Sequence, residues 1–115
     1  MSLETQIQIG VISGNASTII VRCGFVPDYV EIVDTTNRNL VAKWFSNMAA
    51  ASAVKLDASS MGTLTSGGIS SVSGDDDEAA GFKIGVTLSV SAAQLGYVAM
   101  RSNRGFVPAT ANSAG

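Results

Sequence analysis

Hydrophobic residues in this chain recur at every second position, and this period of two is the feature that most restricts the fold. Residues 6–11 alternate, with Ile7, Ile9 and Val11 on one face, and residues 82–90 alternate in the same way. Alternation places side chains on opposite faces of an extended strand, whereas a helix needs apolar residues three or four positions apart. No amphipathic helix of useful length is visible, so the sequence predicts an all-β fold rather than a parallel α/β fold.

Short alternating or β-branched segments separated by turn residues extend this prediction along the chain. Further strands are expected at residues 17–23, 29–33, 39–45, 53–57 and 95–101. The segment 39–45 carries Leu40, Ala42 and Trp44 on one face and Val41, Lys43 and Phe45 on the other. Seven or eight short strands favour one β-sandwich or jelly-roll-like domain over residues 1–101. Residues 102–115 have no period and are predicted to form an extended C-terminal arm.

Two segments carry weaker signals. Residues 47–53 are compatible with one or two helical turns, although they lack an apolar stripe. Residues 66–74 are rich in Ser and Gly, which predicts a loop with one brief strand at Ile69.

In the clearest strand, 82–90, the alternation predicts which side chains are buried and which are exposed. Ile84, Val86 and Leu88 are expected in the core, and Lys83, Thr87 and Ser89 are expected to face outward.

The residue inventory excludes several classes of enzyme. The chain has no histidine and one cysteine, Cys23. Ser-His-Asp and Cys-His catalysis, an intrachain disulfide and a zinc-thiolate cluster are therefore excluded. No phosphate-binding loop, paired-carboxylate site or dinucleotide motif is present. We expect no catalytic residues, no cofactor and no enzymatic activity, and we expect Cys23 to be a small buried hydrophobic residue.

The one acidic run, Asp75-Asp76-Asp77-Glu78, leaves two interpretations open. Four carboxylates on one loop can hold a hard cation such as calcium. The run lacks the alternating ligands and the glycine of an EF-hand loop, which favours a solvated loop tip instead. No metal ligand is assigned.

Charged residues make up only 14% of the chain, with a net charge of −2, against about 25% in ordinary soluble domains. No basic face is present for a nucleic acid, no apolar run approaches the ~18 residues of a membrane span, and the N-terminus does not resemble a signal peptide. Nucleic acid and membrane are therefore not expected partners. A surface so poor in charge is covered either by Ser, Thr and Asn or by other protein, and we favour the second. Exposed strand edges also need partners. We therefore predict a homo-oligomer, with a trimer as the first choice.

The tetrad Gly-Phe-Val-Pro occurs at residues 24–27 and again at 105–108. The first copy lies between two predicted strands and is expected to be structural, as a hairpin or as a crossing between two sheets. The second lies in the arm, where Phe106, Val107 and Pro108 combine an apolar ring with a pre-extended backbone. These three residues are the candidate interface anchor on a neighbouring chain. The alternative is that the arm folds back over its own domain.

An ordered series of residues spans most of the chain between 24 and 101. The series is Gly24-Phe25-x-Pro27-x-x-Val30-x-Ile32, Lys43-Trp44-Phe45 with Met48, Thr65-Ser66-Gly67-Gly68-Ile69, Gly81-Phe82-x-Ile84-Gly85 and Leu95-x-Tyr97-x-Ala99-x-Arg101. It resembles small accessory virion proteins of tailed bacteriophages, which are β-rich proteins of the capsid or tail. The resemblance implies an all-β fold, no catalysis and assembly on a particle, often as symmetric trimers.

Short length and the absence of fibre repeats favour a capsid cement (decoration) protein within this group. Its partners would be itself and the major capsid protein, and its location would be the virion surface after synthesis in the host cytoplasm. The alternative is a tail or fibre component that binds host-surface glycans. That function requires Trp44, Tyr29 and Tyr97 to form a platform at the surface.

Overall fold

The computed structural model describes residues 6–57, 60–75 and 77–102, and within these ranges it contains eight strands and no helix. The strands are β1 (Gln6–Ser13), β2 (Ile19–Val21), β3 (Tyr29–Asp34), β4 (Leu40–Phe45), β5 (Ser52–Asp57), β6 (Met61–Val72), β7 (Gly81–Ile84) and β8 (Gln94–Arg101). The predicted all-β fold is confirmed. Of the arm predicted at residues 102–115, residues 103–115 lie outside the described residues.

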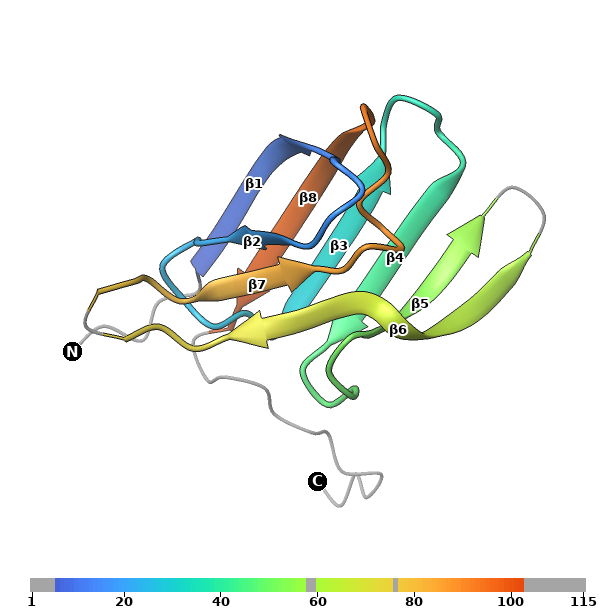
Figure 1. The fold of residues 1–115 in the computed structure, drawn as a ribbon. Coiled ribbons are helices and arrows are strands. Elements are labelled where there is room, and N and C mark those ends of the chain that lie inside the picture. The colour runs from blue at the N-terminus through green and yellow to red at the C-terminus, as the bar shows by residue number, and fades with distance from the viewer. Residues whose placement is uncertain (1–5, 58–59, 76, 103–115) are drawn as a thin grey trace, which may run out of the picture.

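All eight strands belong to one antiparallel sheet in the order β1-β8-β3-β4-β5-β6-β7-β2. The sheet curls on itself, so that β2, β7 and the end of β6 lie in front of β8, β3 and β4 (Figure 1). Phe82 of β7 meets Tyr97 of β8 edge to face, with ring centroids 5.4 Å apart. Two packed layers therefore arise from one continuous sheet.

β6 carries the chain from one layer to the other. Its first residues pair with β5 and its last residues pair with β7. The pairing with β5 jumps from Ala53–Leu64 to Ser52–Ile69, and Gly67 within this jump has a φ of +70°. A bulge and glycines let a strand bend without ending. The loop predicted at residues 66–72 is therefore wrong, because its Ser and Gly residues serve a bend inside a long strand. Ile69 lies in a strand as predicted, and residues 73–74 lie outside the strands.

The core lies between the two layers. Its buried hydrophobic residues are Val21, Phe25, Val30, Ile32, Ala42, Trp44, Ala53, Ile69, Phe82, Ile84, Leu88, Ala93, Leu95, Tyr97 and Ala99. The division predicted for residues 39–45 is confirmed, since Ala42 and Trp44 are buried whereas Lys43 and Phe45 are exposed. The indole Nε1 of Trp44 donates to the carbonyl oxygen of Ala49 at 3.1 Å, which satisfies the polar group of a buried ring.

The first Gly-Phe-Val-Pro tetrad is a crossing between layers rather than a hairpin. β2 pairs with β7 in one layer, and β3 pairs with β4 and β8 in the other. Gly24 has a φ of +91°, and the Phe25 and Pro27 side chains after it are buried. Cys23 is half-buried against the core, and its thiol donates to the Phe25 carbonyl oxygen at 3.3 Å.

The helical turns expected at residues 47–53 are wrong. The segment is a turn after β4, in which the Met48 amide donates to the Phe45 carbonyl oxygen. Ala51 has a φ of +64°, a left-handed conformation that a right-handed helix cannot contain. The Ala51 amide is directed toward β6, where it donates to Ile69 and Ser70. Hydrogen bonds to a distant strand therefore determine the conformation of this segment.

The strand expected at residues 82–90 ends early. β7 stops at Ile84, and the amides of Leu88 and Ser89 both donate to the carbonyl oxygen of Gly85. Because of this turn, the alternation of buried and exposed side chains does not continue regularly from β7 to Ser89. Ile84 and Leu88 are buried and Lys83 and Thr87 exposed, as predicted, but Val86 is 55% exposed and Ser89 is buried. The predicted positions of Val86 and Ser89 are therefore wrong.

β3 ends at a buried carboxylate, Asp34. Its oxygens accept hydrogen bonds from the amides of Thr36 and Asn37 and from the Asn37 side chain, at 2.8–3.1 Å. Burial raises the pKa of the Asp34 carboxyl, but the hydrogen bonds from Asn37 and Thr36 outweigh it and leave the pKa below its ordinary value. The ionised carboxylate thus holds the turn between β3 and β4.

The Asp34 turn predicts a loss of stability in acid. Because the folded pKa is lower than the unfolded value of about 3.9, the contribution is complete above that value and is lost as pH falls through the folded pKa. Urea unfolding between about pH 5 and pH 2 is expected to show a falling free energy of unfolding, with a shallower fall in Asp34→Asn. Asp75 remains in the variant and contributes equally to both curves. Identical pH slopes for the two proteins would contradict this account.

Candidate interaction surfaces

Two acidic side chains of the loop before β7, Asp75 and Glu78, have partners within the protein. The Asp75 carboxylate accepts hydrogen bonds at 2.8 Å from the amides of Asp77 and Glu78, and these bonds lower the pKa of Asp75. Glu78 forms an ion pair with Arg22, whose guanidinium also donates to the Ala79 carbonyl oxygen. Among the described residues, no three His, Cys, Asp or Glu side chains are placed to hold a metal ion.

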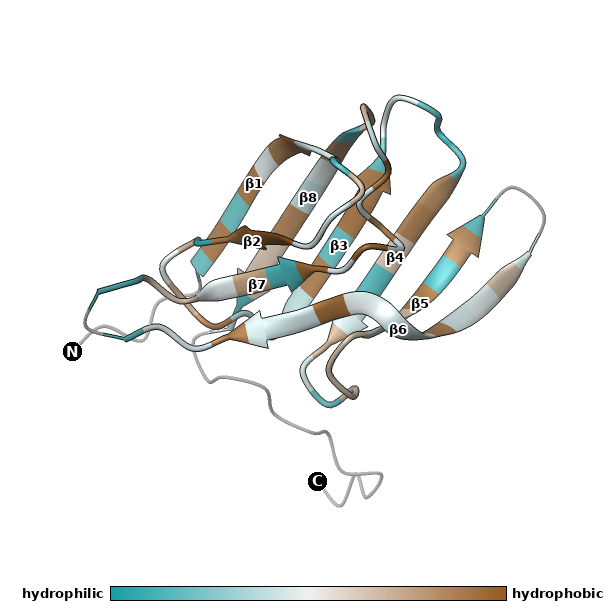
Figure 2. Cartoon of the chain, viewed as in Figure 1, coloured by the Kyte–Doolittle hydropathy of each residue, from teal (hydrophilic) through white to brown (hydrophobic). Residues whose placement is uncertain are grey.

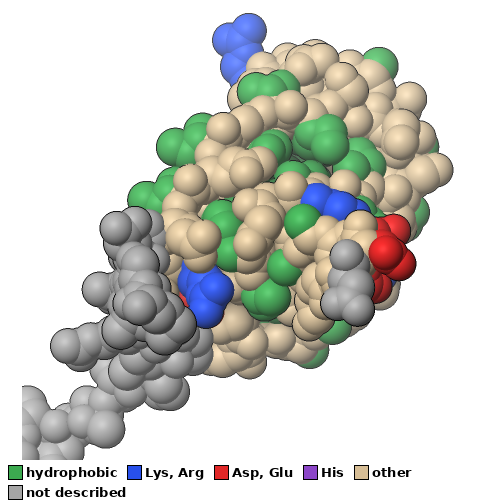
Figure 3. Space-filling model, turned by 90° about the vertical axis from the view of Figure 1, so that its left-hand side faces the viewer, with side chains coloured by type: hydrophobic (Ala, Val, Ile, Leu, Met, Phe, Trp, Pro, Cys, Tyr) green, Lys and Arg blue, Asp and Glu red, His purple; other side chains and the backbone are tan. Residues whose placement is uncertain are grey.

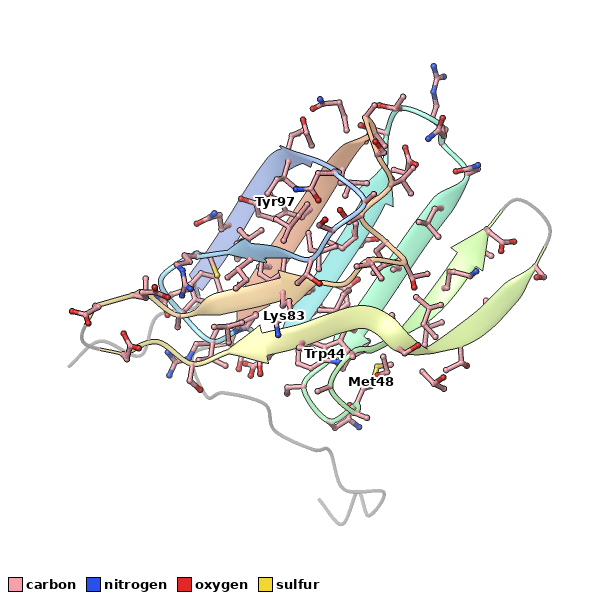
Figure 4. All side chains as sticks on the ribbon, viewed as in Figure 1. Trp44, Met48, Lys83 and Tyr97 are labelled. Atoms are coloured by element: carbon pink, nitrogen blue, oxygen red, sulfur yellow. The ribbon has the colours of Figure 1, made fainter. Side chains whose placement is uncertain are left out.

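The three rings considered for a glycan platform are not on one surface. Trp44 and Tyr97 are buried in the core, on the inner side of the sheet (Figure 4). The Tyr97 hydroxyl accepts a hydrogen bond from Gln8 at 2.8 Å, and its ring lies against Gly10, which has no side chain. Tyr29 is on the opposite side of the sheet and stacks at a tilt on Phe45, with centroids 4.8 Å apart. Phe106, Val107 and Pro108 lie outside the described residues.

The side of the sheet that faces away from the core forms a broad apolar surface, which we call the outer face. It comprises the outward residues of β1, β8, β3, β4, β5 and the start of β6, and the strand register arranges them in three rows across the sheet. The rows are Ile7, Met100, Tyr29 and Phe45; then Ile9, Val98, Glu31, Lys43, Val54 and Thr63; then Val11, Gly96, Val33, Val41, Leu56 and Met61. Twelve of these sixteen residues are hydrophobic or aromatic.

Much of this apolar surface is open to solvent. Ile9 is 73% exposed and Met61 71%, and Ile7, Val11, Phe45, Val54 and Leu56 are also exposed. Figure 2 shows hydrophobic positions in the strands of both layers, and Figure 3, which views the molecule from the side of β1, shows hydrophobic side chains among mostly uncharged atoms. Scattered apolar residues are normal on a surface, but a contiguous apolar patch marks an interaction site.

The only charged residues on the outer face are Glu31 and Lys43. They lie opposite each other in the register between β3 and β4, in the middle row. Burial and the nearby Glu31 carboxylate raise the pKa of Tyr29 in the neighbouring row. The outer face thus has apolar residues on both sides of one central pair of opposite charges.

β1 adds a second candidate surface, its free edge. β1 is the end strand of the sheet, and it pairs with β8 on one side over all eight residues without a register shift. No other described strand pairs with its second side. Natural edge strands are protected by charges, prolines or bulges, and the β1 sequence QIQIGVIS has none of these. We call this unprotected side the β1 edge.

Sequence reasoning identified the components of the outer face without their assembly. It placed Ile7, Ile9 and Val11 together, and Val41, Lys43 and Phe45 together, but these groups are separated by about thirty residues. The usable signal was that strands 29–34 and 40–45 carry large apolar residues on both faces, which is typical of strands covered on both sides.

The described residues contain no helix that would reach across a bilayer. Comparisons with models of protein families, with curated proteins and with solved structures found no match to this chain.

Proposed function

We propose that this chain is a non-enzymatic structural protein that works as a subunit of a larger protein assembly. The observation that carries the proposal is the outer face, on which twelve hydrophobic or aromatic side chains surround a single pair of charges. Burial of apolar surface contributes about 25 cal/mol per Å² against the entropic cost of association, and this contribution needs no further charge. The absence of histidine from the sequence agrees with a role outside catalysis.

The assembly we propose is a tailed-phage virion, in which the chain is a decoration protein on the assembled head. The support for this choice is the ordered series of residues between 24 and 101, which resembles small accessory virion proteins. The major capsid protein is then the lattice partner. Glycan binding as a tail component lacks comparable support, because two of its three candidate rings are buried.

The β1 edge is the proposed contact with the lattice. An unprotected edge can add a strand from a partner, which supplies main-chain hydrogen bonds without any need for charge. β1 is uncharged along its whole length and ends in two exposed polar residues, Gln6 and Ser13. A head protein that offers an extended segment would therefore extend the sheet beyond β1.

Co-sedimentation tests this function. Heads of the encoding phage, prepared without this protein, are mixed with the purified full-length chain and separated on a density gradient, with purified tails run in parallel. We expect saturable binding to heads at a fixed ratio to the major capsid protein. Binding to tails alone, or to neither particle, would overturn the decoration role.

A pair of matched variants locates the contact. Gln6→Lys/Ser13→Lys adds two positive charges to the β1 edge, and Thr65→Lys/Ser71→Lys adds the same charge at exposed positions of β6. Because lysine on an edge strand opposes strand addition, the first variant is expected to weaken head binding at least about tenfold, a change of about 1.4 kcal/mol. The second is expected to bind like the unchanged chain. Equal binding by both variants would place the lattice contact elsewhere.

A further inference from the structure

We propose that the outer face is buried against the outer face of a second copy of this chain, related by a two-fold axis that runs parallel to the strands between β3 and β4. This dimer rests on the proposed structural role, because it names the partner of one surface of the subunit. It leaves the β1 edge available for another protein.

The central charges select this axis. In a sheet-on-sheet contact, a buried carboxylate or ammonium group is stabilised by opposite charges around it and destabilised by like charges. Glu31 and Lys43 are directly opposite in the register, on either side of the proposed axis. Rotation about that axis sets Glu31 against the second copy's Lys43 and Lys43 against its Glu31. An axis across the strands at the same level would instead set Glu31 against Glu31.

The strand order makes the rest of the outer face self-complementary about the same axis. Three strands lie on each side of it, β1, β8 and β3 on one and β4, β5 and β6 on the other. The rotation therefore sets β8 against β5 and β1 against the start of β6. In the third row the small Gly96 then faces the large Leu56 of the second copy. In the middle row Val98 faces Val54, which places an apolar contact beside the charges, and Ile9 faces Thr63 at the margin.

The size of the outer face suits such a dimer. Its sixteen positions, in strands about 4.8 Å apart and rows about 6.7 Å apart, cover roughly 500 Å² of sheet plane. Projecting side chains make the accessible area larger, which approaches the ~800 Å² per partner of a standard stable interface. Packed sheets align their strands within about 30°, as an axis parallel to the strands requires. A second copy carries opposite charges at the positions that face Glu31 and Lys43 about this axis.

Sedimentation equilibrium of the full-length chain tests the dimer. We expect two copies per particle at micromolar concentration. Glu31→Lys and Lys43→Glu alone each place four like charges at the centre of the contact. Each is expected to weaken dimerisation at least about 30-fold, since mispaired buried charges cost about 2 kcal/mol or more. The exchanged variant Glu31→Lys/Lys43→Glu is expected to restore dimerisation to within about threefold.

Lys83→Glu is the matched control. Lys83 is an exposed lysine on β7, in the opposite layer (Figure 4). It undergoes the same change of charge as Lys43→Glu and is expected to leave dimerisation unchanged. Circular dichroism and thermal unfolding confirm that each variant is folded. A monomer, a trimer, or a dimer that does not respond to the two single reversals would overturn the proposal, as would failure of the exchanged variant to recover.

Failure of the dimer and failure of the decoration role give different experimental outcomes. If the chain dimerises through the outer face but does not bind heads, the dimer is supported and the decoration function is rejected. If the chain binds heads as a monomer, or as the trimer expected from the resemblance, the decoration function is supported and the dimer is rejected.

Discussion

Gly81→Ala is expected to lower the free energy of unfolding by about 3 kcal/mol, the upper range for overpacking a tight site. Gly81 is the buried first residue of β7 and pairs with Val72 of β6. A Cβ atom at this position would overlap the Val21 carbonyl oxygen and lie 2.8 Å from the Arg22 Cα. Both atoms belong to backbone, so no side-chain rotation relieves the overlap. Relief requires β2 to move away from β7, which breaks the pairing at the end of the sheet.

Gly62→Ala is the control for this prediction. Gly62 also lies in a strand, β6, but it is exposed and a Cβ atom there would meet no heavy atom within 4 Å. Its expected change is within about 0.5 kcal/mol, as for most surface substitutions. Equilibrium unfolding in urea measures both variants. Similar losses at the two positions would mean that glycine is needed for chain flexibility in general and not for the contact between β2 and β7.

Leu88→Ala is expected to cost about 2–5 kcal/mol of unfolding free energy, the range for removing a large buried aliphatic side chain. Leu88 is completely buried in the core cluster, and it comes from the turn after β7 rather than from a strand. The hydrogen bond from its amide to the Gly85 carbonyl oxygen, 3.1 Å long, closes the turn that points Leu88 inward. The loss therefore measures how firmly this turn is anchored between the two layers.

Val86→Ala distinguishes the turn from a continued strand. Val86 is two residues before Leu88, so a regular strand would bury both side chains. In the turn Val86 is 55% exposed, and its truncation is expected to change stability by less than about 0.5 kcal/mol. Chemical denaturation of the two variants gives the ratio of their effects. Comparable losses would indicate that residues 82–90 form one alternating strand.

Much of the local structure could be predicted because successive side chains of a strand point to opposite faces of the sheet. The alternation in residues 39–45 identified Ala42 and Trp44 as buried and Lys43 and Phe45 as outward, and the structure confirms this division. The strand predicted at 95–101 corresponds to β8 and that at 53–57 to β5. Each of these predictions depends only on neighbours in the chain, which share one pleated backbone.

Local patterns failed where a distant backbone decides the conformation. Ala51 adopts a left-handed conformation because its amide reaches β6. Residues 66–68 are Ser and Gly, a composition typical of loops, but they form the bend at which β6 leaves β5 for β7. In both cases the determining partner is more than ten residues away, beyond the reach of any period in the sequence.

The sequence by itself indicated that this chain is all-β and contains no histidine, and for most strands it indicated which side chains share a face. Only the tertiary structure decided which of those faces is covered. Alternation divides a strand into two faces but does not say which face the second layer covers, because that depends on how the sheet curls. Ile7, Ile9 and Val11 became part of an exposed surface when β1 paired with β8, some ninety residues away. The outer face and its central pair of charges exist only in the folded sheet, since strand register alone brings their residues together.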